Sequence, residues 1–362
     1  MSDNTTIRFI DAGRVSFIRS QTIYHALGYA QTADTPDTIV LVRPDSPYMC
    51  LGFFQDAATE LDLDFCKKIG LPIVRREQGG GCVYIDDQQL FVQWIFQQKS
   101  LPLNVGHRFR LFVKPLIETY KKIGIDAYFH PINDVHVNGK KIVGTGAARI
   151  GSAEIITGNF LFDFNFGAMA RALNVPNDGF RGDFSNCLRQ YLTTIKKELG
   201  VTPKSAIIKK NYVQFCEKML HRKLVPGQFT QGELQLMSEL DEKMQTDEWL
   251  FQHQKPSENF RMVKIHGAVF IGASSFDTPS GKTTVRIRMK DNLIEAISIE
   301  GLTSFFVNAK QTLEQVLTGA ILEEKNLTKQ INKLKTTDYW NEEEAKQLLS
   351  EIIKIKKLKP AN

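Results

Sequence analysis

The stretch Ile73-Val-Arg-Arg-Glu-Gln-Gly-Gly-Gly-Cys-Val-Tyr-Ile-Asp86 places three consecutive glycines between two short apolar runs. Glycine lets a backbone approach a ligand closely and adopt dihedral angles that other residues avoid. The N–H groups of such a loop can cradle an anion, and Arg75 and Arg76 could bind phosphate or carboxylate through planar forked contacts. A glycine-rich hairpin with solvated charges is the simpler interpretation, because a glycine-rich turn is a weak motif on its own.

The composition is that of an ordinary globular protein. The chain has 362 residues, which favours two domains, with 42% hydrophobic and 24% charged residues. A formal charge of +6 permits a nucleic acid or acidic protein partner and demands neither. The sequence has no apolar run of the roughly 20 residues that a membrane helix needs, and its start lacks a secretory pattern. Five scattered cysteines without a CxxC pair indicate free thiols in the cytoplasm.

The hydrophobic patterns predict an α+β fold, and its clearest local signal is a hairpin. Asn138-Gly139 separates Asp134–Val137 from Lys140–Gly144, which is typical of a type I′ turn and places Lys141 on a returning strand. Thr230 and Glu233 predict a capping box, Thr202 and Pro203 a helix start, and Pro115 a kink or a delayed start of its helix. Before residue 250 we expect strands at 38–43, 48–53, 71–76, 82–85, 90–96 and 153–164, and helices at 57–69, 107–123, 167–174, 193–199, 203–222 and 231–246.

A polar, proline-containing segment, 251–259, predicts a linker between two domains. We therefore expect a larger domain over residues 1–250 and a smaller α+β domain over residues 260–362. The smaller domain is predicted to have strands at 261–272, 283–289 and 293–299, followed by helices at 308–322, 325–335 and 341–357.

The charged residues around the glycines suit electrostatic catalysis on anions. Glycine N–H groups and Arg76 would hold phosphates, and Lys141 would bridge a carboxylate and a phosphate as charge develops between them. Asn133 and Asp134 offer oxygen ligands for Mg²⁺. Together the residues describe carboxylate activation by ATP. Each also has a simpler interpretation, Lys141 as a surface lysine and Asn133-Asp134 as turn residues.

The chain resembles the lipoate–protein ligase family. The resemblance rests on Arg75-Arg-Glu-Gln-Gly-Gly-Gly-Cys-Val-Tyr-Ile-Asp86, on Asn133-Asp134, and on Gly139-Lys-Lys-Ile-Val-Gly-Thr-Gly146. Leu51–Gln55 and Gly158–Asp163 extend it, and the region after about 255 is more weakly similar to the family's accessory domain. The combination in this order is specific, although no single piece is.

The resemblance implies a biotin/lipoate-ligase catalytic domain, related to class II tRNA synthetases, with a smaller α+β accessory domain. It implies that lipoate or octanoate reacts with ATP to give acyl-AMP, and that a lysine of a lipoyl-domain protein takes the acyl group. Acceptors would be acyltransferase subunits of 2-oxoacid dehydrogenases or glycine-cleavage H-like proteins, with no nucleic acid or membrane partner. By position, the nucleotide would be contacted by Arg76, Gly81, Cys82, Val83, Tyr84 and Lys141, and lipoate by Arg75, Gly79, Gly80 and the catalytic Lys141.

Two departures keep other functions open. Ile85 and Thr157 stand where the family has histidines. One rival is a transferase that moves the acyl group between carrier domains without ATP, and the other is a non-catalytic lipoyl-binding homologue. The family's cysteine-dependent transferases place their nucleophile outside the triple glycine, and this chain has no cysteine near Asn133-Asp134. Lys141 and the appended domain favour the ligase. Lipoate-dependent exchange of pyrophosphate into ATP would separate the ligase from both rivals.

Overall fold

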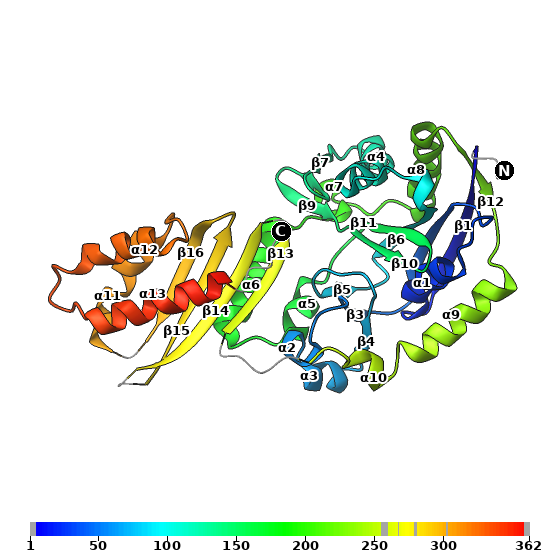
Figure 1. Cartoon of the computed structure of the whole chain (residues 1–362). Coiled ribbons are helices and arrows are strands. Elements are labelled where there is room, and N and C mark those ends of the chain that lie inside the picture. The colour runs from blue at the N-terminus through cyan, green and yellow to red at the C-terminus, as the bar shows by residue number, and fades with distance from the viewer. Residues whose placement is uncertain (1–4, 255–259, 267, 279–280, 302, 358–362) are drawn as a thin grey trace. The chain divides into compact units, whose positions relative to one another are not determined.

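The computed structural model describes residues 5–254, 260–266, 268–278, 281–301 and 303–357. Contacts within the chain divide it into two compact units (Figure 1). The first comprises residues 1–174 and 189–255, and the second residues 175–188 and 256–362. The second unit therefore takes in a segment, 175–188, that the sequence analysis left in the larger domain. Of the predicted linker 251–259, residues 255–259 lie outside the described residues, and the domain limits stay a prediction.

Strands of the first unit form three sheets. Their bounds are β1 (Thr6–Val15), β2 (Thr38–Pro44), β3 (Tyr48–Leu51), β4 (Ile73–Arg75), β5 (Val83–Ile85), β6 (Gln89–Gln97), β7 (Tyr128–His130), β8 (Asp134–Val137), β9 (Lys140–Val143), β10 (Gly146–Ile150), β11 (Ala153–Leu161) and β12 (Lys223–Pro226). The largest sheet has the order β10-β11-β6-β2-β1-β12, and the two smaller ones β4-β3-β5 and β7-β8-β9. β1 runs parallel to β2 and β12, whereas β2, β6, β11 and β10 pair antiparallel.

Some helices of the first unit cover the two faces of the six-stranded sheet, and others contact a smaller sheet. They are α1 (Arg19–Ala30), α2 (Ala57–Glu60), α3 (Leu63–Lys68), α4 (Val105–Lys122), α5 (Phe166–Ala172), α7 (Ile195–Leu199), α8 (Ser205–Leu220), α9 (Gln231–Lys243) and α10 (Asp247–Leu250), with a 3₁₀ turn, η1, at Gln98–Ser100. No helix in the described part of the chain is long and apolar enough to cross a membrane.

The sheet is buried on both faces because its central strands carry apolar residues at successive positions. On β6, Val92, Trp94 and Phe96 enter one core with α4 and α8. Ile95 of β6 enters a second core with α1 and α9. Residues of opposite parity face opposite sides of a strand, so a near-continuous apolar run is expected for such a strand. Trp94 anchors the first core, with its ring centroid 4.8 Å from that of Phe96 and its Nε1 donating to the Tyr212 hydroxyl at 2.8 Å.

The two runs that flank the triple glycine are strands, as predicted, but they do not form a hairpin. β4 pairs parallel with β3, and β5 pairs antiparallel with the other edge of β3. The glycine loop therefore crosses over the end of β3. Gly52, just after β3, lies beneath the loop, and a Cβ built there would come within 2.0 Å of the Gly80 carbonyl oxygen. Only glycine fits that crossing.

The Asn-Gly hairpin is confirmed. β8 and β9 pair antiparallel around Asn138 (φ 49°) and Gly139 (φ 76°), the two positive φ values that a type I′ turn requires. The hairpin places Lys141 opposite His136 on β8.

Several helix boundaries differ from the predictions. The predicted helix 57–69 is two helices, because Leu61 forms a bridge with Leu173 and Asp62 starts α3 by accepting from the Phe65 N–H. α4 runs unbroken through Pro115 from its N-cap at Asn104, so the delayed start was wrong. α8 begins at Ser205 with Lys204 as its N-cap, so the predicted start at Thr202-Pro203 was also wrong.

The second unit is a four-stranded antiparallel sheet with helices on it. Its elements are α6 (Asp178–Tyr191) up to Leu188, β13 (Phe260–His266), β14 (Val269–Thr278), β15 (Gly281–Lys290), β16 (Leu293–Glu300), α11 (Ser304–Leu317), α12 (Glu324–Ile331), the 3₁₀ turn η2 (Asn332–Leu334) and α13 (Glu342–Lys357). The predicted strand 261–272 is two strands, β13 and β14, which pair with each other. α11, α12 and α13 share a core with one sheet face. On the other face, Arg286 is paired with Asp183 of α6 at 3.0 Å.

The capping box at the start of α9 is confirmed and yields a stability prediction. Thr230 Oγ1 accepts from the Glu233 N–H, while the buried Glu233 carboxylate accepts from the Thr230 N–H and from Arg8. Thr230→Ala should lower stability by about 1 kcal/mol, which is a fall in melting temperature of about 2–4 °C. Ser238→Ala, on the exposed side of the same helix, is the control. Equal melting temperatures for the two variants would contradict the cap.

Candidate active site

Arg76 stabilises the glycine loop through hydrogen bonds to its main-chain carbonyls. Its Nη2 donates to the carbonyl oxygens of Gly79 and Gly81 at 2.8 and 2.9 Å, and its Nη1 donates to the Cys50 carbonyl at 3.1 Å. In a trans peptide the C=O and the following N–H point in opposite directions. The N–H groups of Gly80 and Cys82 therefore point away from Arg76. Gly80 has a φ of 97°, and a Cβ there would lie 3.2 Å from Arg76 Nη2.

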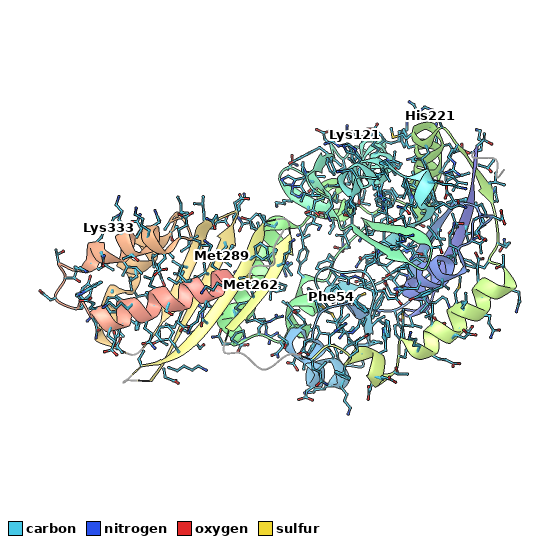
Figure 2. All side chains as sticks on the ribbon, in the orientation of Figure 1. Phe54, Lys121, His221, Met262, Met289 and Lys333 are labelled. Atoms are coloured by element: carbon cyan, nitrogen blue, oxygen red, sulfur yellow. The ribbon has the colours of Figure 1, made fainter. Side chains whose placement is uncertain are left out.

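Arg75 is fully buried and binds the turn after β3, against which the glycine loop packs. Its guanidinium donates to the carbonyls of Gly52 (3.2 Å), Phe53 (2.6 Å) and Gln55 (2.5 Å), and to that of Leu250 at the end of α10 (2.5 Å). Trp249 Nε1 donates in turn to the Arg75 carbonyl at 3.0 Å. These contacts fix the turn after β3, where Phe54 is 69% exposed (Figure 2). The predicted contact of Arg75 with lipoate stays a prediction, and the donors just named are committed to main-chain carbonyls.

His25 of α1, which the sequence analysis missed, holds the other end of the loop. The Glu77 N–H donates to His25 Nε2 at 3.1 Å, so the ring proton lies on Nδ1 and donates to the Gln21 carbonyl at 2.8 Å. Burial, together with the nearby Arg76 charge, lowers the pKa of His25 to about 4. The Glu77 carboxylate accepts from the Tyr29 hydroxyl at 2.7 Å. The loop is thus tied to α1 by a neutral histidine.

Lys141 is paired with a buried carboxylate on the hairpin. Its Nζ lies 2.7 Å from Asp134 Oδ1, with 19% of the Lys141 side chain and 4% of the Asp134 side chain exposed. Burial alone would raise the pKa of Asp134, but the Lys141 ammonium and the contact from His136 hold it well below its usual range. His136 in turn stacks on His130, with ring centroids 4.2 Å apart. Asp134 therefore orients the Lys141 side chain.

A buried chain of hydrogen bonds connects the hairpin to the strand after the glycine loop. Asn159 Oδ1 on β11 accepts from the Gly144 N–H at 3.2 Å, and its Nδ2 donates to Gln89 Oε1 at 2.9 Å. Gln89 Nε2 donates to the Tyr84 carbonyl at 3.0 Å. β11 is thus the common support of the Lys141 hairpin and of β5, which explains why Gly158-Asn159 belongs to the motif. A Cβ at Gly158 would lie 2.7 Å from the Phe112 ring.

The predicted nucleotide contacts on β5 differ in exposure. Val83 is 41% exposed, Cys82 is half-buried, and Tyr84 is buried with its ring edge-on to Phe164. Ile85, which the sequence analysis predicted to replace a family histidine, is buried in one core with residues of α1. Asp86 follows it, and burial raises the pKa of Asp86 to about 6.

The predicted magnesium contacts of Asn133 and Asp134 stay a prediction, and both residues contact other groups of the protein. The Asp134 carboxylate is engaged by Lys141, and the Asn133 carbonyl accepts from Thr145 Oγ1 at 2.6 Å. Within the described ranges no cluster of three or more His, Cys, Asp or Glu side chains is arranged to hold a metal ion. This donor set fits a positioned lysine better than a bound Mg²⁺.

A separate cavity of about 580 Å³ lies between α4, β7 and α8 and contains none of the predicted site residues. Lys121 and His221 lie on its lining, near the ends of α4 and α8 (Figure 2). Lysines in the last turn of a helix complement its dipole, which accounts for the positive charge there.

Two family models match the chain. The sequence matches the description "Lipoyl protein ligase A/B catalytic domain" over residues 22–216 and "Bacterial lipoate protein ligase C-terminus" over residues 274–352. The first match covers more than half of the chain. The chain therefore belongs to the lipoyl protein ligase A/B family, and the resemblance found in the sequence is confirmed.

Individual relatives carry two different activities in their names. The chain is 23% identical to octanoyltransferase LipM of Kyrpidia tusciae over 268 residues, which are 67% of this chain and 98% of that protein. It is 26% identical to lipoate-protein ligase A subunit 1 of Thermoplasma acidophilum over 247 residues, 65% of this chain and 91% of the relative. The relatives therefore define an enzyme of lipoate ligase or octanoyltransferase type without choosing between the two.

Solved structures show the same fold. The bipartite lipoate protein ligase of Thermoplasma acidophilum matches with a TM-score of 0.63 at 23% identity, covering 70% of this chain and 99% of that one. P. falciparum LipL1 in complex with lipoate matches with a TM-score of 0.52 at 14% identity, covering 96% of this chain and 99% of that one. The expected lipoate-ligase fold with a further C-terminal domain is confirmed.

The His25 contact predicts a pH-dependent loss of stability. Because the folded-state pKa of about 4 lies below the ordinary value of 6.5, the unfolded chain takes up a proton between these values and the folded chain does not. Stability should therefore fall as pH drops from 6.5 to 4, by roughly 3 kcal/mol from this residue. Urea unfolding of the wild type and of His25→Gln, at pH values from 7 to 4, checks it. The two curves should converge or cross as pH falls, and parallel curves would refute the assignment.

Proposed function

We propose that this protein is an ATP-dependent ligase that converts lipoate or octanoate to acyl-AMP and transfers the acyl group to a lysine of a lipoyl-domain protein. The observation that carries the proposal is the Lys141–Asp134 pair. A cation fixed 2.7 Å from a buried carboxylate is preorganised, so it need not be reoriented when charge develops beside it.

The chemistry proceeds in two balanced steps. A carboxylate oxygen of the acid attacks the α-phosphorus of ATP, the bond to the β-phosphate oxygen breaks, and pyrophosphate leaves. The acceptor lysine, as a free amine, then attacks the acyl carbon, loses a proton and expels AMP. Lys141 lies between the two anions in the first step and offsets their repulsion. Mg²⁺ would enter with the nucleotide phosphates as part of the substrate.

The glycine loop supplies the anion-binding N–H groups in this proposal. Gly80 and Cys82 direct their N–H groups away from Arg76, as a phosphate contact requires. We assign the nucleotide to Arg76, Gly81, Cys82, Val83, Tyr84 and Lys141, and the acyl group to Gly79, Gly80 and Lys141. Arg75 shapes the acyl side by fixing the turn beneath the loop. The proposed acceptor is a lipoyl domain, which the description of the Thermoplasma ligase structure also names as an E2 lipoyl domain. The proposed location is the cytoplasm.

Lys141→Ala should reduce lipoate- or octanoate-dependent exchange of pyrophosphate into ATP by roughly a hundredfold or more. The single variant leaves the Asp134 carboxylate buried and unpaired, so Lys141→Ala/Asp134→Asn is the matched variant that removes both charges. Thermal unfolding of the single and the double variant checks that each is folded. Near-normal pyrophosphate exchange in a folded double variant would contradict the catalytic role of Lys141.

An ATP-independent octanoyltransferase is the second candidate, because relatives with that name match the chain over nearly their whole length. A cysteine-dependent transferase needs an accessible thiolate. Burial raises the pKa of Cys66 to about 11 and those of Cys187 and Cys216 to about 12, and it raises that of Cys50 as well. Only Cys82, half-buried in the glycine loop, remains for that role.

Cys82→Ser therefore separates the two candidates. The ligase account expects acyl transfer to a lipoyl domain to stay within about threefold of the wild-type rate and to require ATP, because Cys82 contributes its N–H and not its thiol. Abolished transfer in this variant, together with transfer by the wild type from acylated carrier without ATP, would favour the transferase instead.

A further inference from the structure

A cluster of cations surrounds one aromatic ring in the first unit. Lys197 Nζ of α7 lies 4.0 Å from the ring centroid of Phe166, and Arg189 Cζ lies 5.1 Å from the same centroid. Lys140, the first residue of β9, adds a charge that acts on Lys197. Burial, followed by the charges of Lys140 and Arg189, lowers the pKa of Lys197. Lys140, Arg189 and Lys197, the cation cluster, therefore repel one another.

The carboxylates near the cation cluster are engaged by other groups. Asp163 is paired with Lys196 Nζ at 2.7 Å, and the Glu198 carboxylate accepts from the Thr193 hydroxyl. Over the part of the chain that the structure describes, no ion pair joins a member of the cluster to a carboxylate. A cation–π contact is worth only about 0.5–1 kcal/mol at an exposed site. A bound polyanion would offset the repulsion that remains.

The cation cluster adjoins the proposed nucleotide site on two sides. β9 carries the cluster's first lysine directly before Lys141, and the Lys141 carbonyl accepts from the Thr193 N–H at 2.9 Å. This bond attaches the segment before α7 to the hairpin. On the other side, the Phe166 ring is edge-on to Phe164, with centroids 5.0 Å apart, and Phe164 is edge-on to Tyr84 at 6.1 Å. The cluster is thus connected both to the proposed catalytic lysine and to β5.

We propose that Lys140, Arg189 and Lys197 bind the polyphosphate part of the nucleotide, which is the β- and γ-phosphates of ATP and the pyrophosphate released from it. This inference rests on the proposed function and names the residues that contact the leaving group of its first step. As the bond between the α-phosphorus and the bridging oxygen breaks, that oxygen leaves with the pyrophosphate and gains negative charge. Cations fixed beside it stabilise this charge.

The competing explanation is a solvated surface whose long side chains only cover an aromatic ring. Phe166 is 5% exposed, and Lys and Arg side chains commonly lie along apolar surface with their charges in water. In that case neutral substitutions would change stability through lost cation–π contacts and would leave anion binding unchanged. The two explanations therefore differ in whether the affinity for pyrophosphate depends on these charges.

The test is Arg189→Gln/Lys197→Gln in the full-length protein, read by octanoate-dependent exchange of pyrophosphate into ATP. We expect the KM values for pyrophosphate and for ATP to rise roughly tenfold or more, since charge-assisted hydrogen bonds to phosphate are lost. The Kd of the sulfamoyl analogue of octanoyl-AMP should stay unchanged, because this analogue has no pyrophosphate. Lys210→Gln is the matched control: it removes an exposed lysine of α8 in the same unit and should change none of these constants.

An unchanged KM for pyrophosphate in the folded double variant overturns the inference and leaves the proposed function standing. A Kd for the analogue that rises as much as the KM values also overturns it, because the cluster would then act on the adenylate or on the fold. Arg189→Lys/Lys197→Arg keeps both charges and should recover most of the affinity for pyrophosphate. A charge-retaining variant no better than the glutamine variant would contradict the electrostatic role. If the double glutamine variant fails to fold, Lys197→Gln alone is measured with the same outcomes.

Failure of the proposed function has a separate signature. Wild-type protein that exchanges no pyrophosphate refutes the ligase activity. Calorimetric titration of the wild type and of the double variant with magnesium pyrophosphate then decides the inference by itself. Equal affinities would overturn it, whereas binding that is lost in the double variant and kept in Lys210→Gln would support a polyphosphate site.

Discussion

The capture of main-chain carbonyls by two adjacent arginines is the constraint on which this site depends. A loop of three glycines has little conformational preference of its own, and ordering it costs more entropy than ordering other residues. Arg75 binds the turn after β3 and the end of α10, and Arg76 binds the carbonyls of Gly79 and Gly81. Because the carbonyls are taken, the intervening N–H groups face the other way. In the proposed function these N–H groups bind the anionic substrate, and the two arginines hold the loop that presents them.

The same logic applies to the lysine. Lys141 lies on a two-residue hairpin that also carries its counterion, so the pair is set by local backbone geometry. β11 then connects the parts: Asn159 reaches the hairpin through Gly144 and reaches β5 through Gln89, while Thr157 reaches the glycine loop through Gln78. Two residues of one strand, Thr157 and Asn159, therefore hold the glycine loop, the Lys141 hairpin and β5 in register. In this account the catalytic groups act by electrostatic preorganisation, because activation of a carboxylate brings two anions together.

Turns and helix caps could be predicted from the sequence because they depend on neighbouring residues. Contacts between segments that are far apart in the sequence could not be predicted. Asn138-Gly139 and Thr230–Glu233 specify their own turn and cap through nearest neighbours, and both are confirmed. The two runs around the glycines were recognised as strands, but their separation by β3 depends on Gly52, which is distant in sequence. His25 and Gln89 gave no signal because each acts through contacts with remote segments. Pro115 misled because the cap at Asn104 and the apolar face of α4 outweigh a single missing N–H.

The transfer of a carboxylate oxygen to AMP tests the central claim most directly. Octanoate labelled with ¹⁸O in both carboxyl oxygens is incubated with ATP, the protein and a lipoyl domain, and the AMP formed is analysed by mass spectrometry. If an acyl-adenylate is formed, its bridging oxygen comes from the acid and leaves with AMP, so each AMP should carry one ¹⁸O, in proportion to the acyl-lysine produced. Octanoylated domain without AMP, or with AMP that carries no label, would contradict the account.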